Sequence, residues 1–369
     1  MSSKILGTVL SAGMLMVSAF IVFAESPQHR DEGAVGAVYT MTNAPDGNNV
    51  VIFDQDEDGI LTNVGSISTG GTGSGGELDP LGSQNSLILS PDNRWLLAVN
   101  GGSNEISIFR VLPDGLKLVD KVNSGGTFPV SLTIDHNLVY VLNAGASPNI
   151  TGFNLSRKGH LTPLADSTRS LGSGAFSQVG FDPAGETLVV TDKAGSHILV
   201  YSVDDDGLPA VSPVTSISNG QIPFGFIFDR RGYLLVVEAG PNAVSSYKIL
   251  PDDTLQVISG SVPNNGQQAA CWIVRDERGD VFTANTGSGT VSVYRLMGRK
   301  GQVVLLNGAA GSGNKPLDLA VAADGRFLYA LDPGSGTIDM FQIKHNRSLT
   351  NLGAIDGRLP LFAQGIAAR

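Results

Sequence analysis

The stretch at residues 328–338 reads LYALDPGSGTI, an apolar run that ends in an acid, followed by a turn of small residues and a new apolar run. Near copies stand at residues 281–291 (VFTANTGSGTV) and 139–145 (VYVLNAG). The apolar run ends in an amide or an acid seven times, at Asn43, Asn100, Asn143, Asp192, Glu238, Asn285 and Asp332. These positions are 57, 43, 49, 46, 47 and 47 residues apart. Such a period of strand-like units is typical of a propeller or a related array.

Each unit contains short runs rich in β-branched and aromatic residues, separated by Gly, Pro, Asn and Asp. In the second unit the runs lie at residues 86–89, 95–100, 105–111 and 116–122. Four antiparallel strands per unit, repeated seven times, predict an all-β, seven-bladed β-propeller. The first copy starts with a second strand at Ala37, whereas residues 361–368 follow the seventh unit and read as an inner strand. We therefore expect the C-terminal strand to complete the first blade and close the ring.

The N-terminus reads as an export signal. Lys4 precedes a largely apolar run at residues 5–23, and Ala24 ends a sequence that fits a signal peptidase site. The chain therefore divides into a signal peptide at 1–24, a mature tail at 25–36 and a single propeller domain at 37–369. An uncleaved anchor is the alternative, because the run is about long enough to span a bilayer. We expect cleavage and a secreted, periplasmic or extracellular monomer with no membrane attachment.

The composition of the chain narrows the range of binding partners to expect. A formal net charge of −10 argues against nucleic acid and anionic membranes, which attract clustered Lys and Arg. The chain is 41% apolar and only 16% charged, which supports a large folded core. Cys271 is the only cysteine and lies in an apolar run, so we expect no internal disulfide and a buried, inert thiol. No cofactor is expected.

The Trp-Asp and Gly-His dipeptides of WD repeats do not mark these units. Instead VYVLNAG, VFTANTGSGTV and LYALDPGSGTI resemble repeats of the lactonase family of seven-bladed propellers, which includes 6-phosphogluconolactonases and carboxymuconate cyclases, and of the YVTN-type surface-layer repeats. The resemblance covers residues 37–369. It implies an enzyme that hydrolyses or forms a small lactone, of a sugar or an aromatic acid, at the central channel. A non-catalytic extracellular propeller that recognises carbohydrate or protein with a Gly-rich rim is the second hypothesis.

The central channel and one rim are the expected binding region. In a propeller the inner strands line the channel, and the connections between blades form one rim. The longest connection, residues 70–84, could cover the channel mouth with Glu77 and Asp79, or it could be a loose surface loop. Alignment of the inner strands gives a ring of candidate channel-lining residues: Ser86, Ser131, Gln178, Gly225, Cys271, Asp318 and Gln364.

Asp318 is the best catalytic candidate in this ring, because a general base must be a positioned titratable group. The family resemblance implies Pro-Arg-His or a similar triplet in some blades, which would form a cationic site for acidic lactones. Here the aligned triplets read PVS (129–131), PFG (223–225) and PLD (316–318). His197, Lys315 and Arg358 are rim candidates that could contact a ligand. The alternative is that the ring side chains satisfy one another and that the rim charges are solvated.

Metal signals are weak. Residues 54–59 read DQDEDG, like the start of a calcium loop, but Gly65 stands where the closing acid would be needed. The same stretch aligns with other hairpin turns, so we expect a hairpin and no metal site. The amides and acids that end the second strands recur in every unit, which indicates turn capping rather than chemistry.

Overall fold

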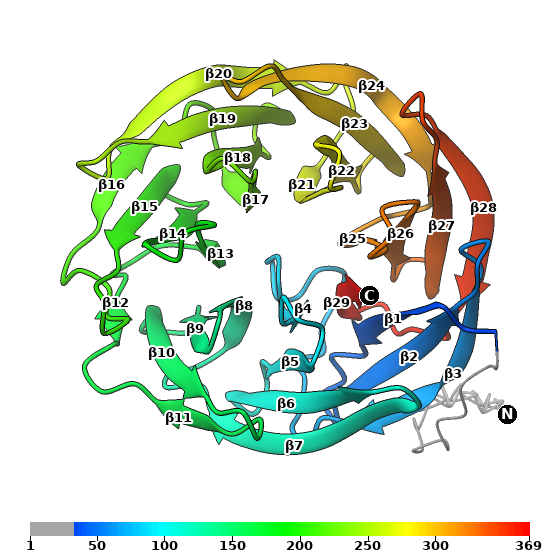
Figure 1. Cartoon of the computed structure of the whole chain (residues 1–369), viewed down its shortest axis with the longest axis horizontal. Coiled ribbons are helices and arrows are strands. Elements are labelled where there is room, and N and C mark those ends of the chain that lie inside the picture. Colours follow the sequence, from blue (N-terminus) through cyan, green and yellow to red (C-terminus); the bar gives the residue numbers. More distant parts are fainter. Residues whose placement is uncertain (1–32) are drawn as a thin grey trace, which may run out of the picture.

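Seven antiparallel sheets form a closed ring in the computed structural model, which describes residues 33–369 (Figure 1). The predicted all-β, seven-bladed propeller is therefore confirmed. The predicted signal peptide at 1–24 and most of the predicted tail at 25–36 lie outside the described residues. Within residues 33–369, no helix has the length and apolar character that crossing a bilayer would require.

Each blade runs from an inner strand at the channel to an outer strand at the surface. Blade 1 contains β29 (Gln364–Ala368), β1 (Gly36–Met41), β2 (Asn49–Gln55) and β3 (Leu61–Ser68). Blade 2 contains β4 (Leu87–Leu89), β5 (Trp95–Asn100), β6 (Glu105–Leu112) and β7 (Gly115–Asn123). Blade 3 contains β8 (Pro129–Asp135), β9 (Leu138–Asn143), β10 (Asn149–Leu155) and an outer edge split into β11 (Leu161–Pro163) and β12 (Arg169–Ser170).

The remaining four blades repeat the order. Blade 4 contains β13 (Phe176–Phe181), β14 (Thr187–Asp192), β15 (His197–Ser202) and β16 (Val214–Ile217). Blade 5 contains β17 (Pro223–Phe228), β18 (Tyr233–Glu238), β19 (Ala243–Ile249) and β20 (Leu255–Pro263). Blade 6 contains β21 (Ala270–Arg275), β22 (Asp280–Asn285), β23 (Thr290–Met297) and β24 (Gln302–Ser312). Blade 7 contains β25 (Leu319–Val321), β26 (Phe327–Asp332), β27 (Thr337–Ile343) and β28 (Leu349–Asp356).

The C-terminal strand closes the ring as predicted. β29 pairs antiparallel with β1, with Ala368 opposite Val38 and Gln364 opposite Met41. Thr40 Oγ1 adds a side-chain bond to Gly365 O at 2.7 Å. The first and last strands of the chain therefore share blade 1, and the inner edge of β1 is covered.

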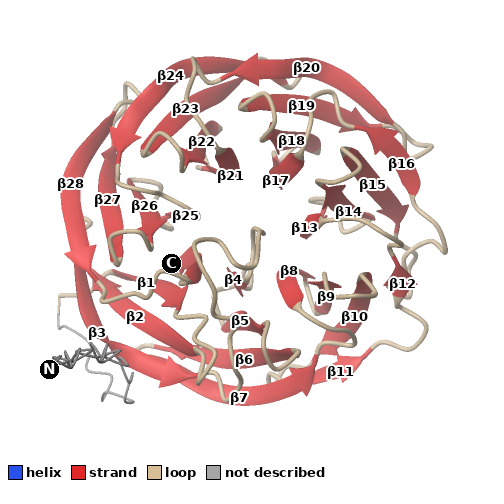
Figure 2. Ribbon diagram, turned by 180° about the vertical axis from the view of Figure 1, so that it is seen from behind, coloured by secondary structure: helices blue, strands red, loops and turns tan. Residues whose placement is uncertain are grey.

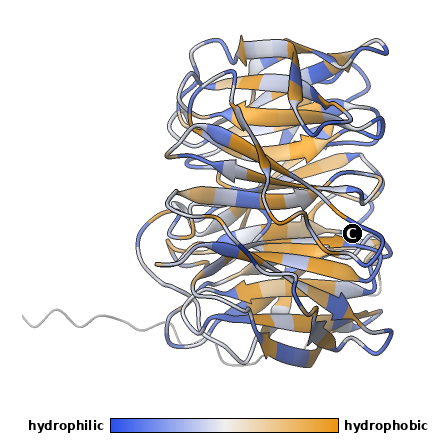
Figure 3. Ribbon diagram, turned by 90° about the vertical axis from the view of Figure 1, so that its left-hand side faces the viewer, coloured by the Kyte–Doolittle hydropathy of each residue, from blue (hydrophilic) through white to orange (hydrophobic). Residues whose placement is uncertain are grey.

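The core lies between the sheets. The six residues of β1 and the six of β5 are all buried. Figure 3 shows hydrophobic colour concentrated along the strands and hydrophilic colour at the turns on both faces of the ring. Trp272 and a tyrosine in most blades, among them Tyr140 and Tyr329, are the largest fully buried side chains. Burial of apolar surface between neighbouring sheets is therefore the main stabilising force of the ring.

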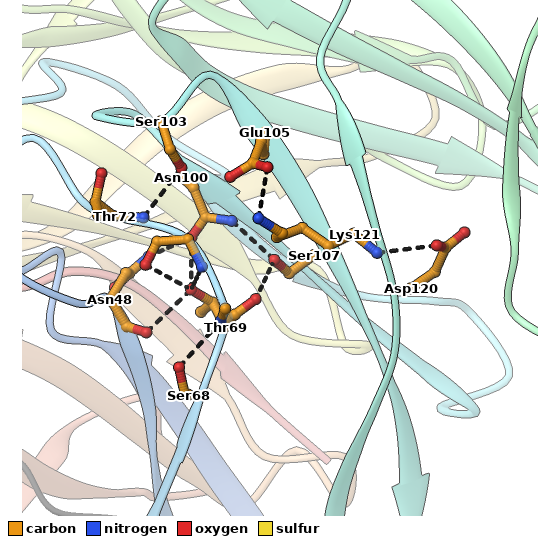
Figure 4. A network of polar contacts seen from close by, with 12 residues as sticks. Asn48, Ser68, Thr69, Thr72, Asn100, Ser103, Glu105, Ser107, Asp120 and Lys121 are labelled. Atoms are coloured by element: carbon orange, nitrogen blue, oxygen red, sulfur yellow. Dashed lines mark hydrogen bonds and ion pairs between the residues drawn. The ribbon is translucent and has the colours of Figure 1, made fainter.

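The residues that end the second strands are buried caps, which confirms their predicted role. Asn100 shows the pattern (Figure 4). Its Oδ1 accepts bonds from Asn48 Nδ2 at 3.0 Å and Thr69 Oγ1 at 2.7 Å, and its Nδ2 donates to Ser107 Oγ at 2.7 Å. The equivalent residues are also buried and form side-chain hydrogen bonds, although the partners differ between blades: Asn43, Asn143, Asp192, Glu238, Asn285 and Asp332.

The calcium-like stretch is a hairpin, as predicted. Asp56 Oδ1 accepts the backbone N–H groups of Asp58 at 2.9 Å and Ile60 at 2.8 Å, which closes the turn between β2 and β3. Within residues 33–369 there is no group of three or more His, Cys, Asp or Glu side chains placed to hold a metal ion.

Candidate functional site

The connection between β3 and β4 enters the middle of the ring (Figures 1 and 2). We call residues 78–85 the plug. Ser83 Oγ donates to Val130 O of β8 at 2.7 Å, and Trp272 Nε1 of β21 donates to Ser83 O at 2.9 Å. The plug is thus bonded to blades 3 and 6 at once. Of the two possibilities that the sequence leaves open for this connection, the structure agrees with a cover over the channel mouth and not with a loose surface loop.

Gln84 of the plug reaches across the channel to β21. Its Oε1 accepts Ile273 N at 3.0 Å, and its Nε2 donates to Ile273 O at 2.7 Å. Gln178 of β13 makes the same pair of bonds to Phe226 of the next inner strand, β17, at 2.7 and 2.9 Å. One blade further on, the position equivalent to Gln178 is Gly225, which has no side chain to offer Ile273.

The missing side chain makes room for the plug. A Cβ on Gly225 would lie 2.1 Å from Gln84 Oε1 and 2.8 Å from Cys271 O, both closer than real Cβ contacts. Gln84, in the connection between blades 1 and 2, therefore supplies the side-chain bonds to Ile273 that β17 cannot make. The plug divides the channel into a rim side, which faces the connections between blades, and a far side, which faces the turns between first and second strands.

Three of the predicted ring residues, Ser131, Gln178 and Asp318, tie one inner strand to the next. Ser131 Oγ accepts Val179 N at 3.2 Å, as Gln178 bonds to β17. The Asp318 carboxylate accepts the backbone N–H of Leu319 at 2.9 Å and that of Ile366 on β29. These side chains thus bond to backbone groups of inner strands rather than to one another. The Ser86 hydroxyl is buried without a partner among the described residues.

Cys271 does not belong to the ring. β21 has a bulge between Ala270 and Trp272, and Trp272 stands opposite Ala284. Ser131 stands opposite Leu142 in the same way, one residue before the end of the second strand. The aligned position in blade 6 is therefore Trp272. The same bulge interrupts β8 between Pro129 and Ser131, so the bulge is common to both blades. The sequence alignment was wrong by one residue because blade 6 has Ala270 in the place of Pro129, so no proline marks the register there.

Four titratable side chains gather on the rim side of the plug: Asp79, Lys193, Cys271 and Asp318. We call them the rim-side cluster. Asp79 Oδ1 accepts bonds from Gln364 Nε2 at 2.6 Å and Gly82 N at 3.0 Å. Lys193 Nζ donates to Gly82 O and lies 4.8 Å from the centroid of the Phe224 ring. A Cβ on Gly82 would lie 2.9 Å from Lys193 Nζ, so glycine permits this approach.

Burial shifts every member of the rim-side cluster toward its neutral form. It raises the pKa of Asp79 to about 6 and that of Asp318 to about 7, and the negative charge of Asp79 adds to the effect on Asp318. It lowers the pKa of Lys193, although Asp79 opposes this. It raises the pKa of Cys271 to about 12, so the thiol is inert, as expected. Asp79 and Asp318 can therefore exchange protons near neutral pH.

The three predicted rim residues lie apart from this cluster. His197 Nδ1 is 3.5 Å from Asp192 Oδ2. Lys315 and Arg358 have exposed side chains, and their backbone N–H groups cap Asp332 and Asp356, each at 2.8 Å. Among the described residues, these three are not the charges that shift the pKa values of the rim-side cluster.

Sequence reasoning identifies Asp79 only as part of the connection that could cover the channel, and it misses Lys193. A signal for Lys193 exists in the repeats. The residue after the capping amide or acid is small or apolar in the other copies, Ala44, Gly101, Ala144, Ala239, Thr286 and Pro333, and is Lys only at 193. Gln84 carries a similar signal, because it stands where other blades have Pro129, Pro223 and Pro316.

Comparisons with known proteins agree with this architecture. Residues 38–175 match the family model described as lactonase, 7-bladed beta-propeller. No curated protein matches the sequence. A candidate 6-phosphogluconolactonase from Bacteroides fragilis superimposes with a TM-score of 0.72 at 17% identity, over 92% of this chain and 98% of that chain.

Two further solved structures resemble the chain equally well in shape. The periplasmic gluconolactonase PpgL of Pseudomonas aeruginosa gives a TM-score of 0.68 at 15% identity, over 89% of this chain and 98% of that chain. A protein of unknown function from Desulfotomaculum acetoxidans gives 0.70 at 14% identity, over 90% and 98%. At these identities the structural likeness shows the fold. With the family match, the chain resembles the lactonase family of seven-bladed β-propellers, as its repeats predicted.

Proposed function

We propose that this protein is an exported, lactonase-like propeller that hydrolyses a small lactone, of a sugar or an aromatic acid, at the rim-side cluster. The observation that carries the proposal is the meeting of Asp79, Lys193 and Asp318 at the channel mouth, where burial moves their pKa values toward neutrality. Titratable groups tuned in this way gather at catalytic sites more often than elsewhere. The resemblance to lactonase propellers supports the choice of reaction.

The chemistry of ester hydrolysis assigns a role to each group. The Asp79 carboxylate takes a proton from water as the water oxygen attacks the lactone carbonyl carbon. The Lys193 ammonium has three N–H donors and gives one to Gly82 O, so it can stabilise the oxyanion that forms. Collapse of the tetrahedral intermediate breaks the ring C–O bond. The proton then passes from Asp79 to the leaving alkoxide, and the product is a hydroxy acid.

Asp318 has a supporting place in this scheme. Its pKa of about 7 leaves it largely protonated in mildly acidic solution, so it does not compete with Asp79 for the charge of Lys193. Run in reverse, the same groups would close a hydroxy acid into a lactone, which is the cyclase form of the reaction.

The test is lactone turnover by the purified mature protein, with gluconolactone and dihydrocoumarin as probes and acid release as the readout. Asp79→Asn and Lys193→Met should each lower kcat/KM by about 100-fold or more, the usual scale for loss of a general base or an oxyanion donor. Asp92→Asn, in an exposed turn of blade 2, is the matched control and should leave turnover unchanged. Turnover that survives both cluster variants would place the chemistry elsewhere.

A second candidate function is non-catalytic binding of carbohydrate or protein by the rim. It is favoured by one observation: Asp79 is already bonded to Gln364 and Gly82, so the cluster also serves to dock the plug. A glycan array and a pull-down from culture supernatant test this function. Binding that Asp79→Asn leaves intact, with no turnover of either lactone, would support it over hydrolysis.

Export and a monomeric state are part of the proposal. The apolar run at residues 5–23 supports export, and a structural relative is named as periplasmic. Mass spectrometry of protein recovered from the producing cell should find an N-terminus at Glu25, and light scattering should give the mass of one chain. A retained Met1, or a dimer mass, would contradict these two statements.

A further inference from the structure

A separate cavity of about 780 Å³ opens on the far side of the plug. Gln84 and Asn85 of the plug line it, so the plug closes it toward the rim. Its walls are the far ends of β8, β13, β17 and β21, together with Val321 of β25. Phe181 and Phe228 bring aromatic surface to these walls. The volume is within the usual range for sites that hold a small molecule.

Arg275 is the informative side chain of this cavity. It is half-buried at the end of β21, its Nε donates to Phe228 O at 2.8 Å, and its Nη1 donates to Asp276 O at 3.2 Å. A guanidinium has five N–H donors, so three remain. No carboxylate of the described residues lies within ion-pair distance of Arg275. Three carboxylates, those of Asp229, Asp276 and Glu277, act on Arg275 from beyond that distance. Each of them is paired with another arginine, and this favours a ligand that brings Arg275 a carboxylate of its own.

Four carboxylates also line the cavity. Each already accepts a hydrogen bond or an ion pair from the protein, so they do not require a cationic ligand. Two are paired with arginines, one with a histidine, and one caps a turn. The contacts are Asp276 with Arg278 at 2.8 Å, Glu277 with Arg230 at 2.8 Å, Asp135 with His136 at 2.9 Å, and Asp182 with the N–H groups of Glu186 and Thr187 at 2.9 Å each.

The other free polar groups of the cavity are also suited to an acceptor-bearing ligand. The Asn85 side-chain amide lines the cavity and has no hydrogen-bond partner among residues 33–369, although its backbone O accepts Leu132 N at 2.9 Å. Thr133 Oγ1 accepts Phe181 N at 3.1 Å, which leaves its own proton to donate. The free donors of Arg275, Asn85 and Thr133 therefore share the cavity with the aromatic side chains of Phe181 and Phe228.

We propose that the far-side cavity is a binding site for a small monocarboxylic acid with an apolar or aromatic body. The carboxylate pairs with the free N–H groups of Arg275, the geometry for which a guanidinium is best suited. The apolar body lies against Phe181, Phe228 and Val321. The plug separates this site from the rim-side cluster, so the inference stands whether or not the protein hydrolyses lactones.

The experiment is calorimetric titration of the mature protein with benzoate, and with benzamide and benzylamine as probes of the same shape but neutral and positive charge. Benzoate should bind and the other two should bind at least about tenfold more weakly, because loss of a charge-assisted bond costs about a factor of ten or more. Arg275→Gln should weaken benzoate binding by a similar factor.

Two further variants make the result specific. Arg94→Gln removes an exposed arginine from a turn between first and second strands in blade 2 and should leave benzoate binding unchanged. Val321→Phe keeps Arg275 but fills the cavity, and should abolish binding even if Arg275→Gln fails to fold. Equal binding of the three probes, tighter binding of benzylamine, no benzoate binding at millimolar concentration, or benzoate binding insensitive to Val321→Phe would each overturn the proposal.

Discussion

Gly225 and Gln84 share one position in the channel: the Gln84 side chain bonds to Ile273 in the space where a side chain at 225 would lie. A Cβ on Gly225 would come within 2.1 Å of Gln84 Oε1. Gly225 is on blade 5, Gln84 lies in the connection between blades 1 and 2, and the two are separated by 141 positions in the sequence. The channel is therefore closed by a pair of residues. Gly225 leaves the space, and the Gln84 side chain fills it and bonds to Ile273.

Gly225→Ala should destabilise the protein by about 1–3 kcal/mol, the usual cost of overpacking. The added methyl must displace Gln84 from Ile273, whose N–H and C=O then lose their partners. Urea unfolding followed by tryptophan fluorescence measures the change, since Trp272 itself bonds to the plug.

The control is a double-mutant cycle with Gln84→Ala. Without the Gln84 side chain, the closest contact of the new methyl would be Cys271 O at 2.8 Å, so Gly225→Ala should cost less in that background. Coupling between the sites should be about 0.5–3 kcal/mol, as for residues in direct contact. Additive effects would show that the two residues do not share a position.

Asn100→Ala should cost about 2–4 kcal/mol, more than a surface change, because Asn48, Thr69 and Ser107 each lose a buried partner. The reading is the midpoint of thermal unfolding by circular dichroism. Ser68→Ala, which removes an exposed acceptor for Gly70 N from the same network, is the matched control and should change stability by about 0.5 kcal/mol or less. Equal losses of stability in Asn100→Ala and Ser68→Ala would show that the buried bonds of Asn100 do not stabilise the blade.

The repeats predicted the propeller because the sequence of each blade has the same pattern of strands and turns. They predicted the closure by β29 because the first copy lacks an inner strand. They also separated structure from chemistry at Asn100 and its equivalents. These features are local and periodic, so they are visible in a single sequence.

The rim-side cluster was harder to predict because its parts come from different blades. Lys193 and Asp79 are brought together only when the 70–84 connection enters the channel, which depends on the absent side chain at Gly225. The alignment in blade 6 was wrong by one residue because Ala270 stands where blade 3 has Pro129, so no proline marks the register.

Arg275 looks like an ordinary strand-end arginine in the sequence. The structure shows that Arg230, Arg231 and Arg278 each have a carboxylate at ion-pair distance, whereas Arg275 has none among the described residues.

Removal of residues 362–369 should prevent stable folding. Without β29, the unpaired edge of β1 would face the channel, although all six residues of β1 are buried in the intact ring. We expect loss of the cooperative thermal transition. A synthetic peptide with the sequence of residues 362–369 should restore it by adding back the strand, whereas a scrambled peptide should not. A truncated chain that unfolds like the intact one would show that closure by β29 is dispensable.

Stability should fall as the pH rises from the unfolded pKa of 3.8 to about 7 and then level off. The folded state raises the pKa of Asp318 to about 7, above the ordinary 3.8, so between these values the folded chain binds more protons than the unfolded chain. The contribution is fully present below the unfolded pKa and is lost as pH approaches 7, by up to about 1.4 kcal/mol per pH unit. Asp79 and Asp339, with pKa values raised to about 6 and about 7, act in the same direction.

Asp318→Asn should therefore be neutral or slightly destabilising at pH 4 and stabilising at pH 8, because its amide oxygen can still accept the N–H groups of Leu319 and Ile366 without a buried charge. Thermal unfolding at several pH values should show a flatter profile than that of the unmodified protein, with the remaining slope due to Asp79 and Asp339. Asp114→Asn, in an exposed turn of blade 2, should keep the original slope. An unchanged slope in Asp318→Asn would mean that the Asp318 carboxyl is not the group whose proton is lost.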